Sequence, residues 1–184
     1  MTTRDLLIGS ASGAVISECG KFRYLLSRQW DSRPLLLFVM LNPSTADAHV
    51  DDATIRRCVT FAAAHDFGGI EVVNLFAFRA TQRRDLALVG WPAGGPEADR
   101  HIAAAAVRAG AICAAWGVVG DRGPANDRVQ QVAPILRASG KPLQCLRVTR
   151  SGYPQHPLYL PSICRLQDFA AAVDAALGAA LCPR

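Results

Sequence analysis

The sequence lacks any apolar run long enough to cross a bilayer. The longest run, near residues 34–41, is far shorter than the roughly 20 residues that a transmembrane helix needs. No long apolar stretch of the signal-peptide kind lies near the N-terminus. With 51% apolar and 19% charged residues over 184 positions, the composition is that of one globular domain. We therefore expect a soluble, cytoplasmic protein with no membrane partner.

Lysine is also scarce. Only Lys21 and Lys141 are lysines, so the net charge of +5 is carried almost wholly by arginine. The planar guanidinium group suits phosphate because it donates two hydrogen bonds at once. High-GC codon usage produces the same bias without any functional cause. The charge therefore agrees with a nucleic-acid or nucleotide partner but does not establish one.

Paired cysteines and several common catalytic motifs are missing. None of the six cysteines forms a CxxC pair, and most lie in apolar segments, so we predict free thiols, mostly buried, and neither a metal nor another cofactor. The sequence contains no GxGxxG fingerprint, no GxxxxGK[ST] loop and no GxSxG elbow. Dinucleotide binding of the Rossmann type, P-loop chemistry and a nucleophile-elbow serine therefore have no motif to support them.

The chain does contain four apolar runs that alternate with helix-like segments. The runs, at 34–41, 69–78, 109–117 and 141–148, are typical of strands that are covered on both faces. Apolar residues recur at helical spacing in the segments that follow, with Pro134 expected to kink or break the third: 52–67, 96–109, 123–140 and 163–181. This order predicts an α/β fold, a three-layer α/β/α sandwich around a mostly parallel four-stranded sheet.

The first 33 residues differ from the rest of the chain. The stretch GAVISECGKFRYLLSRQW predicts two short strands, which we interpret as a β-hairpin at the sheet edge or over one face. We therefore predict a single domain, 1–184, in which residues 1–33 form a hairpin extension and 34–184 the sandwich core. Residues 79–96 are rich in glycine and proline near their end and are typical of a long surface loop.

Polar and aromatic residues gather where the predicted strands end. Ligands of open α/β sheets bind outside the carboxyl ends of the strands, so these residues are expected to share one edge. An amide inside a strand, such as Asn74, needs partners, because leaving it unpaired when buried costs roughly 1–3 kcal/mol. The candidates after the four strands in turn are Asn42, Pro43, Ser44, Thr45 and Asp47; Asn74, Phe76 and Arg79; Trp116 and Gly117; and Arg150, His156 and Tyr159.

Structural explanations stand beside these functional ones. Asn42 can simply turn the chain, and Ser44 or Thr45 can cap a helix, although Asp51 or Asp52 is the better cap for the helix through Arg56. The same caution applies to two later candidates. Trp116 can be a core residue, and a lone histidine such as His156 is more often structural than catalytic.

The motifs MLNPSTAD, DDATIRRC, VVNLFAFRAT, AAWG and HPLYL occur in this order. Together they resemble an uncharacterised bacterial family, a domain of unknown function with an LNPSTAD motif. The resemblance extends over nearly the whole chain and implies no particular activity.

A more remote resemblance is to the uracil-DNA glycosylase superfamily, and it implies that fold. MLNPS is similar to the loop whose Asn or Asp positions the attacking water, which implies this role for Asn42. VVNLFAF is similar to the segment whose Asn reads the base edge, which implies that role for Asn74. YPQHPLYL is similar to the loop whose histidine polarises the base carbonyl, which implies that role for His156. The sequence departs from the superfamily in having Ser44 in place of a glycine and HPL in place of HPS.

This resemblance implies an N-glycosidic hydrolase acting on a modified base in nucleic acid or on a nucleotide. Asp47 would assist the water held by Asn42, and Phe76 or Trp116 would stack on the base. Phosphates would be held by the helix N-terminus after the first strand and by arginines, namely Arg56, Arg57, Arg79 and Arg150. Two alternatives stay open: a non-catalytic module that binds a nucleotide or nucleic acid in the same cleft, and another hydrolase or transferase that uses Asp47 and His156. The base, the polymeric or monomeric form of the substrate and the oligomeric state stay undetermined.

Overall fold

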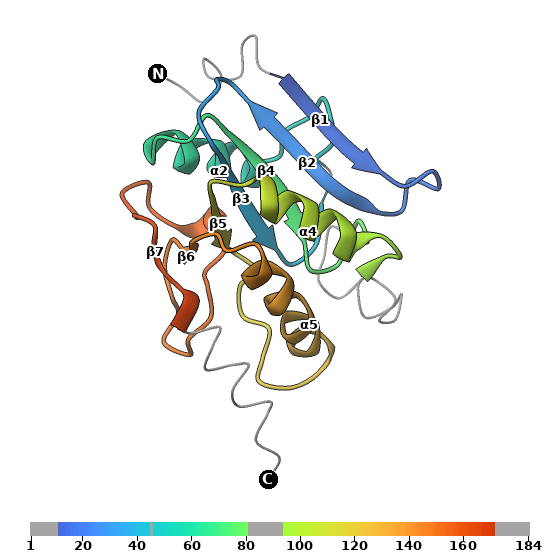
Figure 1. Cartoon of the computed structure of the whole chain (residues 1–184). Helices are drawn as coiled ribbons and strands as arrows, with labels where there is room; N and C mark the ends of the chain where they lie inside the picture. The colour runs from blue at the N-terminus through green and yellow to red at the C-terminus, as the bar shows by residue number, and fades with distance from the viewer. Residues whose placement is uncertain (1–10, 45, 81–93, 172–184) are drawn as a thin grey trace.

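The protein forms a mixed α/β fold around one seven-stranded sheet (Figure 1). The computed structural model describes residues 11–44, 46–80 and 94–171. The strands lie in the order β1-β2-β4-β3-β5-β6-β7. Their bounds are β1 Ala11–Ile16, β2 Arg23–Gln29, β3 Leu35–Met40, β4 Gly69–Asn74, β5 Ala111–Ala114, β6 Leu143–Cys145 and β7 Gln167–Asp168.

The centre of the sheet is parallel and both edges are antiparallel. Strand β3 pairs in parallel with β4 and β5, and β5 pairs in parallel with β6. On one edge β2 runs antiparallel to β4 and carries β1, and on the other β7 runs antiparallel to β6. The four predicted apolar runs each contain one of the central strands. The sheet has seven strands rather than four, because the hairpin continues it at one edge, which is one of the two predicted placements, and β7 extends it at the other.

Helices cover both faces of the sheet. Helix α2, Ala53–Ala64, packs on one face, and helices α4, Ala98–Arg108, and α5, Pro124–Ala138, pack on the other (Figure 1). Alternation along β3 explains the two layers, because successive side chains of a strand point to opposite faces. Leu36, Phe38 and Met40 join the core beneath α2, and Leu37 and Val39 join the core beneath α4 and α5.

The helix predictions succeed where a strong apolar stripe is buried and fail at the C-terminal end. Of the predicted kink or break at Pro134, the break does not occur, because α5 continues through this residue. The helix predicted for 163–181 is wrong in its first part: Ile163 is 85% exposed, and the chain then forms β7. The apolar spacing of Ile163 and Leu166 imitates a helix face, whereas residues 167 and 168 pair with β6. Residues 172–181 of that prediction lie outside the described residues.

Two further properties concern the helices and the cysteines of the described residues. None of the helices in this part of the chain is both long and apolar enough to cross a membrane. Cys58, Cys113, Cys145 and Cys164 are buried free thiols, as predicted, whereas Cys19 is exposed.

Candidate functional site

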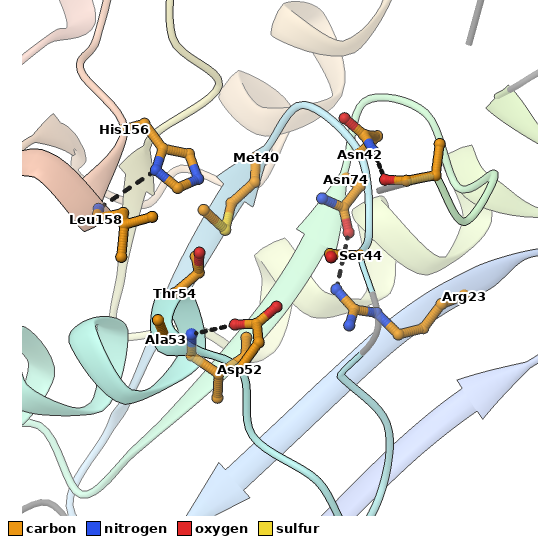
Figure 2. A pocket seen from close by; sticks show the side chains of 12 residues that line it. Arg23, Met40, Asn42, Ser44, Asp52, Ala53, Thr54, Asn74, His156 and Leu158 are labelled. Carbon is orange, nitrogen blue, oxygen red and sulfur yellow. Dashed lines mark hydrogen bonds between the residues drawn. The ribbon is translucent and has the colours of Figure 1, made fainter. Parts of the chain in front are cut away.

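A cavity of about 330 Å³ opens where β3 and β4 end, against the first turn of α2 (Figure 2). It receives side chains from β2, from both strand ends, from the helix start and from the loop around His156. Both apolar and polar residues line it. The lining residues are Arg23, Met40, Asn42, Ser44, Asp52, Ala53, Thr54, Ile55, Asn74, Ala80, His156 and Leu158.

Asn42 ties the loop after β3 to the loop after β4. Its Nδ2 donates to the carbonyl oxygen of Ala80 at 2.7 Å and to that of Pro43 at 3.2 Å. The backbone N–H of Ala80 donates in return to the Pro43 carbonyl at 2.9 Å. These bonds orient the amide and occupy its nitrogen, so the carbonyl oxygen is the atom that Asn42 can offer to a ligand.

Asn74 is the last residue of β4 and is 3% exposed. Its Oδ1 accepts a hydrogen bond from Nη2 of Arg23 at 3.4 Å. Because a guanidinium group only donates, this contact assigns the oxygen of the amide to Arg23 and directs Nδ2 elsewhere. Asn74 therefore offers N–H donors to the pocket.

His156 stands at the opposite side of the pocket, before the short 3₁₀ helix η2, Pro157–Tyr159 (Figure 2). Its Nδ1 accepts from the backbone N–H of Leu158 at 3.3 Å, which places the proton of the neutral ring on Nε2. Burial lowers the pKa of His156 below 6.5, and the charge of Asp52 opposes this only in part. The ring is thus neutral near pH 7 and able to donate from Nε2.

The segment of the chain that forms the pocket matches a known family model. A model described as "Protein of unknown function (DUF1643)" matches residues 23–158. The chain belongs to this family. Neither the curated proteins nor the solved structures include a match. The DUF1643 region begins at Arg23 and ends at Leu158, so every residue that lines the pocket lies inside it.

The structure brings together several of the predicted site residues of this DUF1643 domain. Asn42, Ser44, Asn74 and His156 line the cavity, and Pro43 supports it through its carbonyl group. Tyr159 is 83% exposed, and its ring centroid lies 6.0 Å from that of His156, beside the pocket lining. Thr45 lies outside the described residues.

The predicted stacking residues belong to the core instead. Phe76 is 2% exposed, and Trp116 is 5% exposed and packs edge-on against Phe169. Neither lines the pocket, so neither ring is placed to stack on a ligand there. Gly117 follows at φ +77°, a conformation that favours glycine, and its N–H donates to the Pro154 carbonyl. Gly117 therefore allows the chain to turn after β5.

The predicted phosphate-binding arginines do not line the pocket. Arg57 donates to Ser162 Oγ at 2.8 Å and to the Leu160 carbonyl, with its guanidinium group over the Phe61 ring. Arg56 donates to the backbone carbonyl of Asp51. Arg56 and Arg57 are thus engaged in hydrogen bonds with other groups of the protein. Arg79 and Arg150 also lie outside the lining, so no phosphate contact in the cavity is assigned to them.

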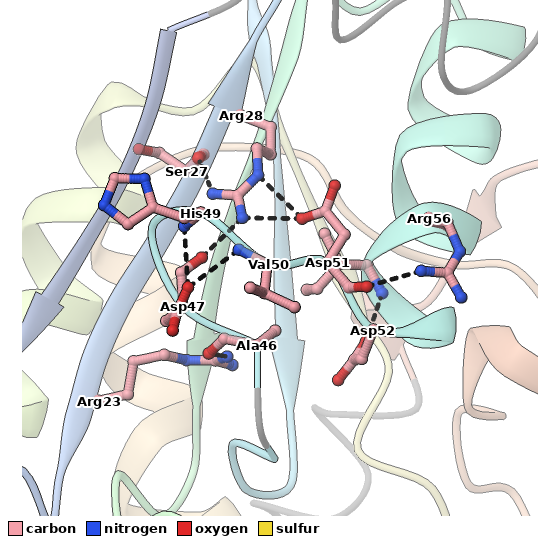
Figure 3. A network of polar contacts seen from close by, with 11 residues as sticks. Arg23, Ser27, Arg28, Ala46, Asp47, His49, Val50, Asp51, Asp52 and Arg56 are labelled. Atoms are coloured by element: carbon pink, nitrogen blue, oxygen red, sulfur yellow. Dashed lines mark hydrogen bonds and ion pairs between the residues drawn. The ribbon is translucent and has the colours of Figure 1, made fainter.

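Asp47 also lies outside the pocket lining, in a turn (Figure 3). Its Oδ1 accepts from the backbone N–H groups of His49 and Val50 at 2.8 and 2.9 Å. These two bonds lower the pKa of Asp47. The carboxylate of Asp47 thus stabilises the loop between β3 and α2 rather than facing the cavity.

Sequence reasoning missed two charged residues of the pocket, Arg23 and Asp52. Asp52 was recognised only as a helix cap, which it is: its Oδ1 accepts from the Ile55 N–H at 2.9 Å. Its carboxylate also lines the cavity. Arg23 lies in β2, and only the pairing of β2 with β4 brings it beside Asn74. An arginine within the apolar run FRYLL was the one available signal.

The lowered pKa of His156 predicts an acid-dependent loss of stability. The folded protein binds this proton less readily than the unfolded chain, so the contribution is present above about pH 6.5 and is lost as the pH falls toward the lower folded pKa. We expect the melting temperature to fall less in His156→Gln than in the wild type between about pH 7.5 and about pH 5.5. Thermal denaturation at both pH values measures this difference. Equal falls in the two proteins would show that His156 is not the titrating group.

Proposed function

We propose that the pocket is the active site of an N-glycosidic hydrolase that acts on a nucleotide or on a modified base in nucleic acid. One observation carries this proposal: Asn42, Asn74 and His156, from three separated segments, line one cavity. Each offers the type of group that cleavage of a base from its sugar needs. The reaction passes through an oxocarbenium-like sugar, so it requires a positioned water and stabilisation of negative charge on the departing base.

The water would be held on one side of the cavity. The carbonyl oxygen of Asn42 can accept a hydrogen bond from it, but an amide cannot remove a proton. Asp52 supplies the carboxylate that can, since it lines the same cavity and its second oxygen is not used by the helix cap. We therefore assign to Asp52 the assisting role that the sequence predicted for Asp47.

The departing base would be held by the donors on the remaining walls. Nε2 of the neutral His156 and Nδ2 of Asn74 can both donate to a base oxygen as negative charge develops there. Donors of this kind in other enzymes contribute roughly 3–4 kcal/mol each. The apolar floor, formed by Met40 and Ile55, suits the face of a heterocycle.

The proposal includes a remote relation to the uracil-DNA glycosylase superfamily. The order of the three residues along the chain and their presence in the lining of one cavity support it. Similarity of fold does not assign an activity, so the reaction must be tested directly.

A screen for released base provides that test. The purified protein is incubated with oligonucleotides carrying modified bases and with nucleotides, and abasic sites and free bases are measured. We expect release from at least one substrate and a rate about 100-fold lower in Asn42→Ala, because the water loses its orientation. Asn126→Ala in α5, outside the pocket lining, is the matched amide control and should keep the wild-type rate.

Release of no base by the folded protein from any substrate would contradict the hydrolase proposal. The non-catalytic alternative then predicts that a nucleotide raises the melting temperature and that Asn74→Ala removes this effect. The alternative that pairs Asp47 with His156 lacks a shared site, because Asp47 is not among the residues that line the cavity.

A further inference from the structure

Arg23 differs from the other buried charged residues of the described chain. Arg28 is 2% exposed and pairs with Asp51 at 2.7 Å, and Arg128 is 8% exposed and pairs with Asp99. Glu71 is 6% exposed and pairs with Arg108. Arg23 is 3% exposed, yet no carboxylate among the described residues forms an ion pair with it. It is also the one of these four that lines the pocket.

The guanidinium group of Arg23 keeps unused hydrogen-bond donors. Nη1 donates to the Ala46 carbonyl at 2.8 Å, and Nη2 donates to Oδ1 of Asn74 at 3.4 Å. Nε is buried and has no partner among the described residues. A guanidinium group carries five N–H donors, and two of the five are used in these contacts, which leaves three. Both acceptors are uncharged, so neither compensates the positive charge.

A buried charge without an ion-pair partner is costly, which calls for an explanation within the site. Burial lowers the pKa of Arg23 to about 10, so the group still carries its charge near pH 7. A buried cation of this kind is normally stabilised by an anion at close range. The other two buried arginines, Arg28 and Arg128, each form an ion pair with a carboxylate of the protein, and Arg23 does not.

We propose that Arg23 binds an anionic group of the ligand, so that the pocket accepts a small molecule or nucleotide with a carboxylate or phosphate group beside Asn74. The inference rests on the proposed function only in taking this cavity as the ligand site. Arg23 can donate to such a group while keeping its bond to Asn74, because its donors form a planar fork. Nδ2 of Asn74 can add a further hydrogen bond to the same ligand.

Asp52 limits which ligands fit. Its carboxylate lines the same cavity and raises the pKa of Arg23 through its charge, but it forms no ion pair with Arg23. The pocket therefore presents a cation and an anion at different places on its wall (Figure 2). A matching ligand places its anionic oxygen atoms at Arg23 and keeps N–H or O–H groups, or a water, at Asp52.

Binding of matched ligand pairs tests this assignment without requiring catalysis. Orotate is compared with uracil, which lacks the carboxylate, and uridine 5′-monophosphate is compared with uridine, which lacks the phosphate. Isothermal titration calorimetry measures each affinity. We expect the anionic member of at least one pair to bind about 10- to 100-fold more tightly, as charge-assisted hydrogen bonds to a buried arginine do. The pair that shows the difference distinguishes a carboxylate from a phosphate.

Two variants locate the effect. Arg23→Gln should remove the preference for the anion, whereas Arg100→Gln, which removes an exposed arginine of α4 outside the lining, should keep it. Equal binding of charged and neutral members by the wild type, or no binding of either anion, would overturn the inference even if Arg23→Gln does not fold. Anion binding without base release would instead refute the hydrolase and leave the anion site in place.

Discussion

Replacing Asp52 with asparagine is expected to slow base release by about 100- to 10,000-fold, the range typical for loss of a general base. The carboxylate lines the same cavity as Asn42, and in the proposed reaction it takes a proton from the attacking water. Asparagine keeps the shape of the side chain but cannot take that proton. The rate of base release under single-turnover conditions, on whichever substrate the screen identifies, measures this effect.

The same substitution should leave the fold nearly unchanged, which separates chemistry from stability. Asp52 caps α2 through the Ile55 N–H, and asparagine is as good a helix cap as aspartate. We therefore expect Asp52→Asn to melt close to the wild-type temperature. Asp52→Ala removes both the charge and the cap and should cost about 1 kcal/mol of unfolding free energy in addition.

Asp47→Asn is the matched control for the charge. It changes the same residue type in the same loop, but Asp47 lies outside the pocket lining and bonds to two backbone N–H groups. Its rate of base release should stay close to that of the wild type. A large loss in Asp47→Asn together with an active Asp52→Asn would restore the role predicted from the sequence and exclude Asp52.

Local patterns were sufficient to predict the central strands and part of the site. Asn42, Asn74 and His156 were found because each lies at or beyond the end of an apolar run, and the ends of parallel strands meet at one edge. Arg23 and Asp52 were missed because the sequence alone does not show that either side chain reaches the pocket. Arg23 reaches the pocket through the antiparallel pairing of β2 with β4, and Asp52 serves as a cap and a pocket residue at once.

The predicted site residues that do not line the cavity have an equally physical explanation. An aromatic residue near a strand end can face the pocket or the core, and sequence position alone does not decide between them. Phe76 and Trp116 both pack in the core beneath α4 and α5. In the sequence, an arginine near the start of a helix likewise looks free to bind a phosphate. In the structure, Arg57 instead donates hydrogen bonds to Leu160 and Ser162, in the segment that follows His156.

A second large effect is expected on stability, from Arg28→Met. Arg28 is 2% exposed, pairs with Asp51 and donates to the backbone carbonyls of Ser27 and Asp47 (Figure 3). Methionine fills much of the volume but leaves Asp51 without its cation and removes the hydrogen bonds that Arg28 donates to two carbonyl groups. We expect a loss of about 3–5 kcal/mol of unfolding free energy and a fall in melting temperature on the order of 10 °C.

A double-mutant cycle and a surface control make this prediction specific. Arg28→Met combined with Asp51→Asn should be less destabilising than the sum of the single variants, because the second change removes the unpaired charge. Arg33→Met breaks the exposed pair with Asp31 and should cost no more than about 1 kcal/mol. Strict additivity in the cycle, or equal losses for Arg28→Met and Arg33→Met, would contradict the structural role of the buried pair.

The Arg28 variant also tests how the pocket is held in shape. Two arginines of β2 contact the loop between β3 and α2: Arg23 through the Ala46 carbonyl, and Arg28 through Asp47 and Asp51. Asp52 follows directly and carries the pocket carboxylate. Arg28 does not line the cavity, but its charge acts on Arg23, so a neutral ligand such as uridine is the probe that isolates the effect of the loop. Weaker binding of uridine by folded Arg28→Met, well below its melting temperature, would show that β2 holds Asp52 in position, and unchanged binding would show that the cap of α2 suffices.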